Sequence, residues 1–350
     1  MQKPEKVPLE ARQRPATVFD VAAQAGVAVG TVSRYLNGLP MRPGNRAAVE
    51  DAIKSLRYNR NAVAQAMRTE RTNMVALLVP GYDEFFAGML AHLTRGLAAE
   101  GQVLLTHKHE GDPKALGLAL EFFQNHRVNA VIAPGVKEVR PQLEALINQG
   151  IPIILFNNDV PDLQVDRVFS KDREGAQRAV RHLINLGHKR IAVITGDLRE
   201  TTAQHRLDGY LDALDEAGLP HNPDFVVGGS WLRRDAEIGM LKLMEQEPRP
   251  TAIFTSNYVL AFAVLDNLRE RGMVPGREIS LASFDDVELF RQITPAVTAV
   301  AQPHAAIGDH IAQIVLDHLS GRRPNQPRRV MLECNMILRD TAQPPFEQKS

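Results

Sequence analysis

The sequence predicts an α/β protein in which a small helical head and a short hinge helix precede two doubly wound, parallel-sheet subdomains. Two observations carry this prediction. Close to the N-terminus, three apolar patterns with helical spacing follow one another, separated by a glycine and by a Pro/Gly-rich loop. From residue 74 onward, short apolar runs alternate with helical patterns, which is typical of parallel strands covered by helices on both faces.

The head begins with a capping signal. Thr17 is placed to cap a first helix, and Asp20 stands three residues later, in the capping-box position. Gly26 marks the turn after this helix, and the apolar spacing predicts a second helix over 28–36 and a third over 45–56. These residues are too few to bury a core unless the three helices pack together, so they predict a helix-turn-helix head.

The second predicted helix offers polar side chains to the outside. Thr31, Ser33 and Arg34 supply two hydroxyls and a guanidinium on its outer face. Such groups suit a helix that enters the major groove of DNA. A small helical hairpin with a polar surface is the alternative interpretation.

Charge is distributed unevenly along the chain. Residues 1–73 contain 12 Lys and Arg against 6 Asp and Glu, whereas the net charge of the whole chain is zero. A basic head therefore precedes an acidic body. Cationic side chains bind phosphates by releasing counterions, so this asymmetry favours a polyanionic partner for the head alone.

The remaining composition excludes several classes of protein. Cys334 is the single cysteine, which excludes an internal disulfide and favours a cytoplasmic location. Residues 1–15 form a lead-in without the apolar run of a signal peptide, and no stretch is long enough to span a membrane. His107 and His109 could bind a metal as a pair, but the sequence indicates no further ligands for it. We therefore expect them to lie at a solvated end of a strand, without a metal.

The body contains apolar runs that are continuous enough to be strands buried on both faces. They suggest two sheets, with the break near 166–172, and ligands of such sheets bind at the carboxyl ends of the strands. Two facing sheets would therefore form a cleft, as in periplasmic-type binding proteins. The predicted strands are 75–79, 103–106, 130–133, 151–156, 191–195, 225–227, 252–255, 279–284 and 297–300. After residue 324, one last run follows over 329–338.

This order of parts resembles the lactose-repressor family of bacterial transcription regulators. The head contains FDVAAQAGVAVGTVSRYLNG, and the similarity continues through LRYNRNAVAQAMRTERT, GHKRIAVITG, RLDGY, FTSN, ISLASFDD and TAVAQP. It covers about residues 16–340. Many spaced matches over three regions are specific, whereas any one of them alone would be weak.

The resemblance implies the following domain organisation. The parts are a lead-in (1–15), a helix-turn-helix domain (16–60), a hinge helix and linker (61–73), an N-terminal effector subdomain (74–169 with 302–326), a C-terminal effector subdomain (170–301 with 327–340) and a tail (341–350).

It also implies which residues contact DNA. The two positions that read bases in the family hold Val29 and Gly30 here. Valine can contact only the methyl group of thymine, and glycine has no side chain to contact a base, so direct readout of the base sequence should be poor. Met67 stands where the family has a leucine that wedges into the minor groove, although a role in domain contacts is the alternative. The implied DNA-contacting residues are Thr17, Val29, Gly30, Thr31, Ser33, Arg34, Asn37, Asn61, Ala64 and Met67.

For the cleft, the resemblance implies a small effector. Phe85 and Phe86 could stack on a ring of the effector or belong to the core. We expect one of them to face the effector and the other to lie in the core. Asn257 and Asp285 could bind sugar hydroxyls, or merely cap turns. The implied effector-binding residues are Phe85, Phe86, Asn157, Arg206, Asn257, Tyr258 and Asp285.

Two departures from the family bear on the chemistry of the effector. Asn157 and Tyr258 stand where many sugar-binding members have aspartate. With fewer carboxylates in the cleft, a sugar acid or sugar phosphate becomes more plausible than for those members.

The sequence therefore predicts a homodimeric DNA-binding regulator, most often a repressor in this family, and not an enzyme. Its partners would be a pseudo-palindromic operator in double-stranded DNA and a small effector, a sugar or a sugar acid or phosphate, with no cofactor. Effector and operator would be coupled allosterically. The alternatives are a transporter's solute-binding protein, which shares the body, and an α/β enzyme, for which no nucleophile, metal or cofactor motif is found.

Overall fold

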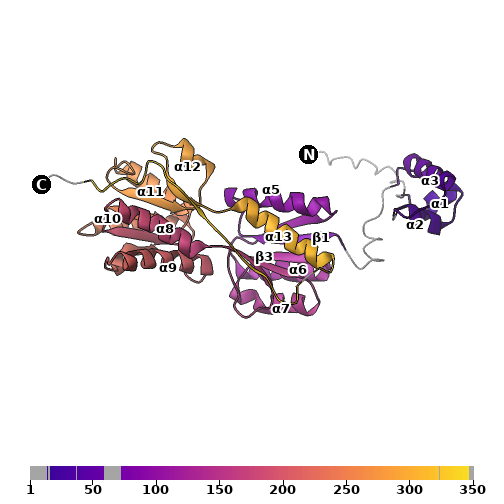
Figure 1. Cartoon of the computed structure of the whole chain (residues 1–350), viewed down its shortest axis with the longest axis horizontal. Helices are drawn as coiled ribbons and strands as arrows, with labels where there is room; N and C mark the ends of the chain where they lie inside the picture. Colours follow the sequence, from indigo (N-terminus) through magenta and orange to yellow (C-terminus); the bar gives the residue numbers. More distant parts are fainter. Residues whose placement is uncertain (1–13, 15, 37, 59–71, 323, 347–350) are drawn as a thin grey trace, which may run out of the picture. The chain divides into compact units, whose positions relative to one another are not determined.

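The computed structural model describes residues 14, 16–36, 38–58, 72–322 and 324–346. The chain divides into two compact units, Met1–Thr72 and Asn73–Ser350. The first contains the helices of the head, and the second contains two six-stranded sheets with their covering helices (Figure 1).

The head consists of helices α1 (Val18–Ala25), α2 (Val29–Leu36) and α3 (Pro43–Ser55). The capping box is confirmed, because Thr17 Oγ1 accepts from Asp20 N at 3.3 Å and the Asp20 carboxylate accepts from Thr17 N at 2.7 Å. Gly26 ends α1 with φ +63°, a left-handed conformation that glycine adopts without steric cost.

One valine from each helix forms the centre of the head. Val21, Val32 and Val49 are completely buried in one apolar cluster. The third helix begins at Pro43, earlier than the predicted 45, because the fixed φ of proline suits the first helical turn.

The first sheet has the strand order β11-β5-β4-β3-β1-β2, and all its pairs are parallel. Helices α5 and α13 pack on one face, and α6 and α7 on the other. The strands are β1 (Met74–Val79), β2 (Val103–Lys108), β3 (Ala130–Pro134), β4 (Ile153–Phe156), β5 (Asp166–Ser170) and β11 (Arg329–Leu332). The helices are α5 (Glu84–Ala99), α6 (Pro113–Asn125), η1 (Lys137–Val139), α7 (Arg140–Asn148) and α13 (His304–Leu319).

The second sheet has the order β12-β10-β9-β8-β6-β7, with β12 antiparallel to β10. Helices α8 and α9 cover one face, and α10, α11 and α12 the other. The strands are β6 (Ile191–Thr195), β7 (Val226–Gly228), β8 (Ala252–Thr255), β9 (Ser280–Phe284), β10 (Thr298–Ala301) and β12 (Asn335–Ile337). The helices are α8 (Asp172–Asn185), α9 (Thr201–Glu216), η2 (Pro223–Phe225), α10 (Arg233–Glu245), α11 (Tyr258–Glu270) and α12 (Glu288–Gln292).

The continuous apolar runs of the strands follow from this double cover. In β1, Val75 and Leu77 belong to the cluster under α5 and α13, whereas Ala76 and Leu78 belong to the cluster under α6 and α7. Because successive side chains of a strand point to opposite faces, both faces must be apolar. All nine predicted strands are present, with small differences at their ends.

The sequence interpretation missed β5 and merged two other strands. The predicted last run, 329–338, is in fact β11 in the first sheet and β12 in the second, separated by Glu333 and Cys334. Residues 327–332 therefore go with the first subdomain, and their assignment to the C-terminal subdomain was wrong. The chain crosses between the subdomains three times, near residues 171, 302 and 333.

The strand exit after β2 also differs from its prediction. His107 is exposed, but His109 is buried and its Nδ1 accepts from Gly111 N at 3.2 Å. Burial, as the largest cause, lowers the pKa of His109 to about 4. Among the described residues, no three His, Cys, Asp or Glu side chains are grouped as metal ligands, and no helix there is long and apolar enough to cross a bilayer.

Candidate functional site

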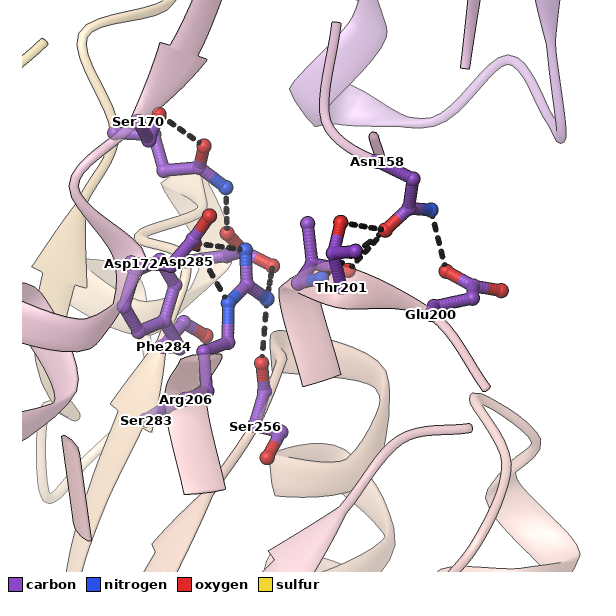
Figure 2. Close-up of polar contacts among 12 residues, drawn as sticks. Asn158, Ser170, Asp172, Glu200, Thr201, Arg206, Ser256, Ser283, Phe284 and Asp285 are labelled. Atoms are coloured by element: carbon purple, nitrogen blue, oxygen red, sulfur yellow. Dashed lines mark hydrogen bonds and ion pairs between the residues drawn. The ribbon is translucent and has the colours of Figure 1, made fainter. Parts of the chain in front are cut away.

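A buried ion pair lies at the carboxyl end of the second sheet. Arg206 on α9 donates through Nε to Asp172 Oδ1 at 2.9 Å, and its Nη2 lies 2.8 Å from the same oxygen. Its Nη1 donates to the main-chain oxygen of Ser256, which follows β8, at 2.6 Å (Figure 2). Arg206 is 5% exposed and Asp172 is 4% exposed. The guanidinium group that is predicted to bind the effector therefore forms its hydrogen bonds with groups of the chain itself.

Aromatic rings flank the same guanidinium. Its central carbon lies 3.8 Å from the ring centroid of Phe284 and 5.8 Å from that of Trp231. Burial lowers the pKa of Arg206, but the carboxylates of Asp172 and Asp285 outweigh it and raise the pKa above its ordinary value. Arg206 therefore stays charged throughout the physiological pH range.

Asp285 links this ion pair to a crossing between the subdomains. It follows β9 with φ +67°, and one of its oxygens lies 3.8 Å from Arg206 Nη1. Gln302 Nε2 donates to Asp285 Oδ1 at 2.6 Å, and Ser170 Oγ donates to Gln302 Oε1 at 2.7 Å. The site thus shares hydrogen bonds with two of the three crossings.

The two subdomains meet at the side chain of Asn158, which follows β4. Its Oδ1 accepts from Thr202 N and Thr202 Oγ1, both at 3.0 Å, and from Thr201 Oγ1 at 3.3 Å. Its Nδ2 donates to Glu200 Oε2 at 2.8 Å. Figure 2 shows Asn158 placed above the first turn of α9, which carries Arg206 farther along.

A second set of contacts lies between the start of α5 and the other subdomain. Glu288 N donates to Glu84 Oε1 at 2.5 Å, and burial, together with the negative charge of Asp83, raises the pKa of Tyr258. Since Asp83 follows β1 and Tyr258 follows β8, the carboxyl ends of both sheets face each other, as predicted for a ligand-binding body.

We call this region the junction. It comprises Asp83, Asn158, Asp172, Glu200, Thr202, Arg206, Tyr258 and Asp285.

The structure gives core positions to both predicted phenylalanines. Phe85 is 6% exposed and Phe86 is 3% exposed. Phe85 packs edge-on against His304 at 4.7 Å between ring centroids, and Phe86 against Phe156 at 6.1 Å. Neither ring face is open to a stacking ligand in this arrangement, and an effector contact of either ring stays a prediction.

The two predicted asparagines have local roles. Asn257 caps α11, because its Oδ1 accepts from Leu260 N at 3.0 Å, which is the alternative that the sequence left open. Asn157 has φ +58°, and the residue after it, Asn158, makes the contacts across the junction.

Charge at the junction contradicts the reason given for an anionic effector. Four of its members are carboxylates, Asp83, Asp172, Glu200 and Asp285, and three of them, Asp172, Glu200 and Asp285, interact with the single guanidinium of Arg206. Carboxylates are therefore not scarce here, and a sugar acid or sugar phosphate would bring a further negative charge into a negative site.

Sequence reasoning missed several members of this site. Trp231 is the single tryptophan of the chain and stands three residues after the end of β7; its ring flanks the Arg206 guanidinium. Gly196 makes room for it, because a Cβ there would lie 2.4 Å from the Trp231 ring. A lone tryptophan after a strand was the available signal, whereas nothing in the sequence singled out Asp172 or Glu200.

In the head, five of the predicted DNA-contacting residues, Val29, Gly30, Thr31, Ser33 and Arg34, lie on α2. Gly30 and Arg34 are exposed, and Arg34 Nη2 donates to Pro40 O at 3.0 Å. Val29 is half-buried against the head core. Thr31 and Ser33 are also half-buried.

Thr17, a further predicted DNA contact, caps α1. Its Oγ1 donates to Asp20 Oδ2 at 2.7 Å, and it accepts from Asp20 N as the N-cap. The other four predicted DNA-contacting residues, Asn37, Asn61, Ala64 and Met67, lie outside the described residues.

Comparison with known proteins assigns the family. The model of bacterial regulatory proteins, lacI family, matches residues 17–69, and that of a periplasmic binding protein-like domain matches residues 180–342. The HTH-type transcriptional regulator DegA of Bacillus subtilis is 31% identical over 338 residues, which cover 94% of this chain and 98% of DegA. The chain belongs to the lacI family of bacterial regulatory proteins. It is a DNA-binding transcriptional regulator, and the family consists of regulators, not enzymes.

Other lacI-family relatives are similar over the whole chain. The transcriptional regulator CelR of Thermobifida fusca is 30% identical over 344 residues, 95% of this chain and 100% of CelR. The transcriptional repressor PurR of Haemophilus influenzae is 29% identical over 329 residues, 93% of this chain and 98% of PurR.

Two solved structures of the same fold cover most of the chain. A CelR–cellobiose complex superposes with a TM-score of 0.72 at 28% identity, covering 93% of this chain and 99% of that one. The Lac repressor dimer bound to operator and an anti-inducer superposes with a TM-score of 0.84 at 23% identity, covering 94% and 100%. The latter similarity supports the fold alone.

Proposed function

We propose that this lacI-family regulator is a repressor whose affinity for operator DNA is set by a small, polyhydroxylated, sugar-like effector bound at the junction. The meeting of both subdomains at Asn158 is the observation that carries this proposal. A ligand bound there contacts both subdomains, so it changes the free energy of one arrangement relative to another. The CelR relative, whose solved complex contains cellobiose, supports a sugar as the chemical class.

The effector contacts that we propose are polar and aromatic. Asp285, Arg206 and Tyr258 remain from the sequence prediction, and Trp231 joins them as an aromatic surface for a sugar ring. Asn157 remains an untested candidate. We propose the domain boundaries that the sequence predicts, with 327–332 moved to the first subdomain.

On the DNA side, we propose that α2 enters the major groove. Arg34 and the backbone around Gly30 lie on its exposed face, and Thr17 offers its hydroxyl at the start of α1. The basic charge of residues 1–73 supports phosphate contacts, which supply affinity without sequence information.

We further propose a homodimer on a pseudo-palindromic operator, since two-fold symmetry of the protein would be matched in the DNA. Exposed apolar side chains on and before α10 support an interface there: Leu232 is 66%, Leu241 50% and Ile238 43% exposed. A regulator that binds a bacterial genome works in the cytoplasm, where we place it.

A gel shift with a salt titration tests the DNA part. We expect specific binding to the DNA upstream of the protein's own gene, with an affinity that falls as salt rises. A solute-binding protein, the alternative with the same body, would bind no fragment, and that result would overturn the proposed function.

A variant at the junction tests the effector part. Arg206→Ala would leave Asp172 buried without a counter-charge, which destabilises a protein strongly, so Arg206→Lys is the better change. With an effector found by a thermal-shift screen of sugars, we expect Arg206→Lys to lose the effector's influence on the gel shift and to keep operator binding. Arg181→Lys, on the exposed side of α8, should behave as the unmodified protein does. A retained response in Arg206→Lys would place the effector elsewhere.

A further inference from the structure

Helix α9, which carries Arg206, does not cap its own N-terminus. Glu200, at the N-cap position, has the extended backbone of an N-cap residue, with φ −91° and ψ 139°, but its side chain caps no N–H group of the described first turn. Helices α5 and α11, which also begin at the junction, are capped by their own N-cap residues, Asp83 and Asn257. The first N–H groups of a helix have no acceptor within the helix, so α9 requires one from outside.

This acceptor comes from the opposite subdomain. Thr202 is the second residue of α9, and its buried N–H donates to Asn158 Oδ1 at 3.0 Å (Figure 2). An N-cap side chain normally accepts from the second or third N–H of its helix. The hydroxyl of Thr202 donates to the same oxygen at 3.0 Å. Asn158 therefore takes the place of the N-cap side chain of α9, although it belongs to the first subdomain.

Asn158 is fixed to the first sheet. Its main-chain oxygen accepts from the N–H of Gly135, which follows β3, at 2.8 Å, and a Cβ at Gly135 would collide with that oxygen. The carboxylate of the next residue, Asp159, accepts from Arg167 Nε on β5 at 2.7 Å and from Arg329 Nη1 on β11 at 3.1 Å. The capping residue is thus tied to three strands of the first subdomain and must move with them.

The capped turn lies next to Arg206. Thr202 and Arg206 are four residues apart on α9, so they lie on the same face of the helix, one turn from each other. Arg206 itself donates to Asp172 and to the main-chain oxygen of Ser256, both in the second subdomain. Successive turns of one helix are therefore held by opposite subdomains.

We propose that Asn158 is the N-cap of α9, supplied by the opposite subdomain, so that α9 is capped while the two subdomains are in contact at the junction and loses its cap when they separate. Loss of a cap weakens the first turn of a helix, and here the next turn carries Arg206. Closure of the body and order in this helix are therefore coupled. The cap itself needs neither effector nor DNA, and its use in regulation rests on the effector site proposed above.

Hydrogen exchange of the full chain, followed by mass spectrometry without effector or DNA, tests the cap. In Asn158→Ala we expect the start of α9 to exchange about fivefold faster, the equivalent of the 1 kcal/mol that a typical cap contributes. Exchange in α10 of the same subdomain should be unchanged. The proposal is overturned if exchange at the start of α9 is unchanged, or if α10 speeds up by the same factor.

Asp112→Ala is the matched control. Asp112 caps α6 within the first subdomain, and its Oδ1 accepts from the second helical N–H, that of Lys114, at 2.9 Å. This variant should speed exchange at the start of α6 and leave α9 unchanged. An equal change at α9 in both variants would show that exchange there does not depend on Asn158 as a cap, and it would overturn the proposal.

A cap placed in α9 itself should make Asn158 dispensable. Serine is a favoured N-cap residue, and the extended backbone of Glu200 suits it, so Glu200→Ser gives α9 a cap of its own. In this background, Asn158→Ala should no longer speed exchange at the start of α9. If the double variant exchanges as fast as Asn158→Ala alone, Asn158 does not act by capping and the proposal fails.

The operator gel shift separates this proposal from the proposed function. If operator binding is present but exchange of α9 does not respond, only the cap is wrong. If exchange responds as expected but no DNA is bound, the cap stands and the proposed function fails.

Discussion

Gly30 is a glycine that the helix around it does not require. It lies on the exposed face of α2, its φ is not positive, and a Cβ there would meet nothing within 4 Å. Glycine destabilises a helix interior by roughly 0.5–1 kcal/mol relative to alanine. We therefore expect Gly30→Ala to slow hydrogen exchange of the α2 amides by a corresponding factor.

Gly26 provides the matched control in the same head. With φ +63°, alanine at this position costs roughly 1 kcal/mol, so Gly26→Ala should speed the same exchange. If Gly30→Ala also speeds it, the glycine has a structural role in α2 that its surroundings do not reveal. If it slows exchange but weakens operator binding, close approach of the backbone to DNA explains the glycine.

The acid sensitivity of the body should depend on Asp166. Burial raises its pKa, but hydrogen bonds from His318 at 2.5 Å and from Arg328 N at 2.6 Å outweigh this, and the pKa is lowered overall. A carboxyl group with a lowered folded-state pKa stabilises the fold above its unfolded pKa, and this stabilisation is lost as pH falls through the folded value. We expect the melting temperature to fall as pH decreases below about 4.

The variant Asp166→Asn identifies the group responsible. It should melt at a lower temperature than the unmodified protein at neutral pH, and the two should converge in acid. A constant difference between them from neutral to acidic pH would show that the charge of Asp166 is not the cause.

At the scale of elements, helices α8 and α9 depend on one small residue for their close approach. A Cβ at Gly209 would lie 2.1 Å from Arg173 O and 2.9 Å from Gln177 N, both main-chain atoms of α8. Overpacking of this kind costs about 1–3 kcal/mol, so Gly209→Ala should lower the melting temperature of the body. Because Gly209 is three residues from Arg206 on the same helix, we also expect a weaker effector response.

A second helical glycine in the body distinguishes close packing from helix propensity. At Gly117 on α6, a Cβ would lie at an ordinary 3.5 Å from the end of the Gln142 side chain. Gly117→Ala should therefore leave stability unchanged or raise it. If both variants melted alike, the close approach at Gly209 would not be what limits the packing of α8 and α9.

The elements that could be predicted from the sequence are those whose own side chains indicate whether each residue is buried, capped or exposed. The apolar strands and the Thr17 cap belong to this class. The strand β5 was missed because it begins with Asp166 and Arg167, which look like a surface pair. Arg167 is buried because it donates to Asp159 and to the main-chain oxygens of Val160, Leu163 and Val165, and no local pattern predicts such partners.

The same limit applies to the site. Arg206 and Asp285 could be placed because the resemblance supplied a motif for them. Asn158 was missed in favour of its neighbour Asn157, since only the backbone turn at φ +58° decides which of two adjacent amides crosses the junction. The charge of the site was misjudged because Asp83 and Glu200 enter it from helix starts that the sequence interpretation did not bring together.

At the scale of the whole molecule, the proposed homodimer depends on apolar surface that the single chain leaves exposed. Leu241 lies on α10 and is 50% exposed. A buried charge in an interface without a partner is costly, so Leu241→Glu should convert a dimer into monomers in size-exclusion chromatography with light scattering, and it should weaken operator binding. Leu118→Glu, on α6 of the other subdomain and 60% exposed, is the control. If Leu118→Glu dissociates the protein and Leu241→Glu does not, the interface lies on the first subdomain.

The splitting of the last strands between two sheets also affects how the chain folds as it is made. The edge of β5 stays unpaired until β11 is available, and the edge of β10 until β12 is available. The ribosome synthesises the chain from its N-terminus, so the head can fold before the body is complete. Both sheets remain incomplete until the same short stretch, 329–337, has been synthesised. Until then each sheet exposes an open strand edge, the kind of surface on which chains aggregate. Synthesis of residues 329–337 therefore completes both sheets together.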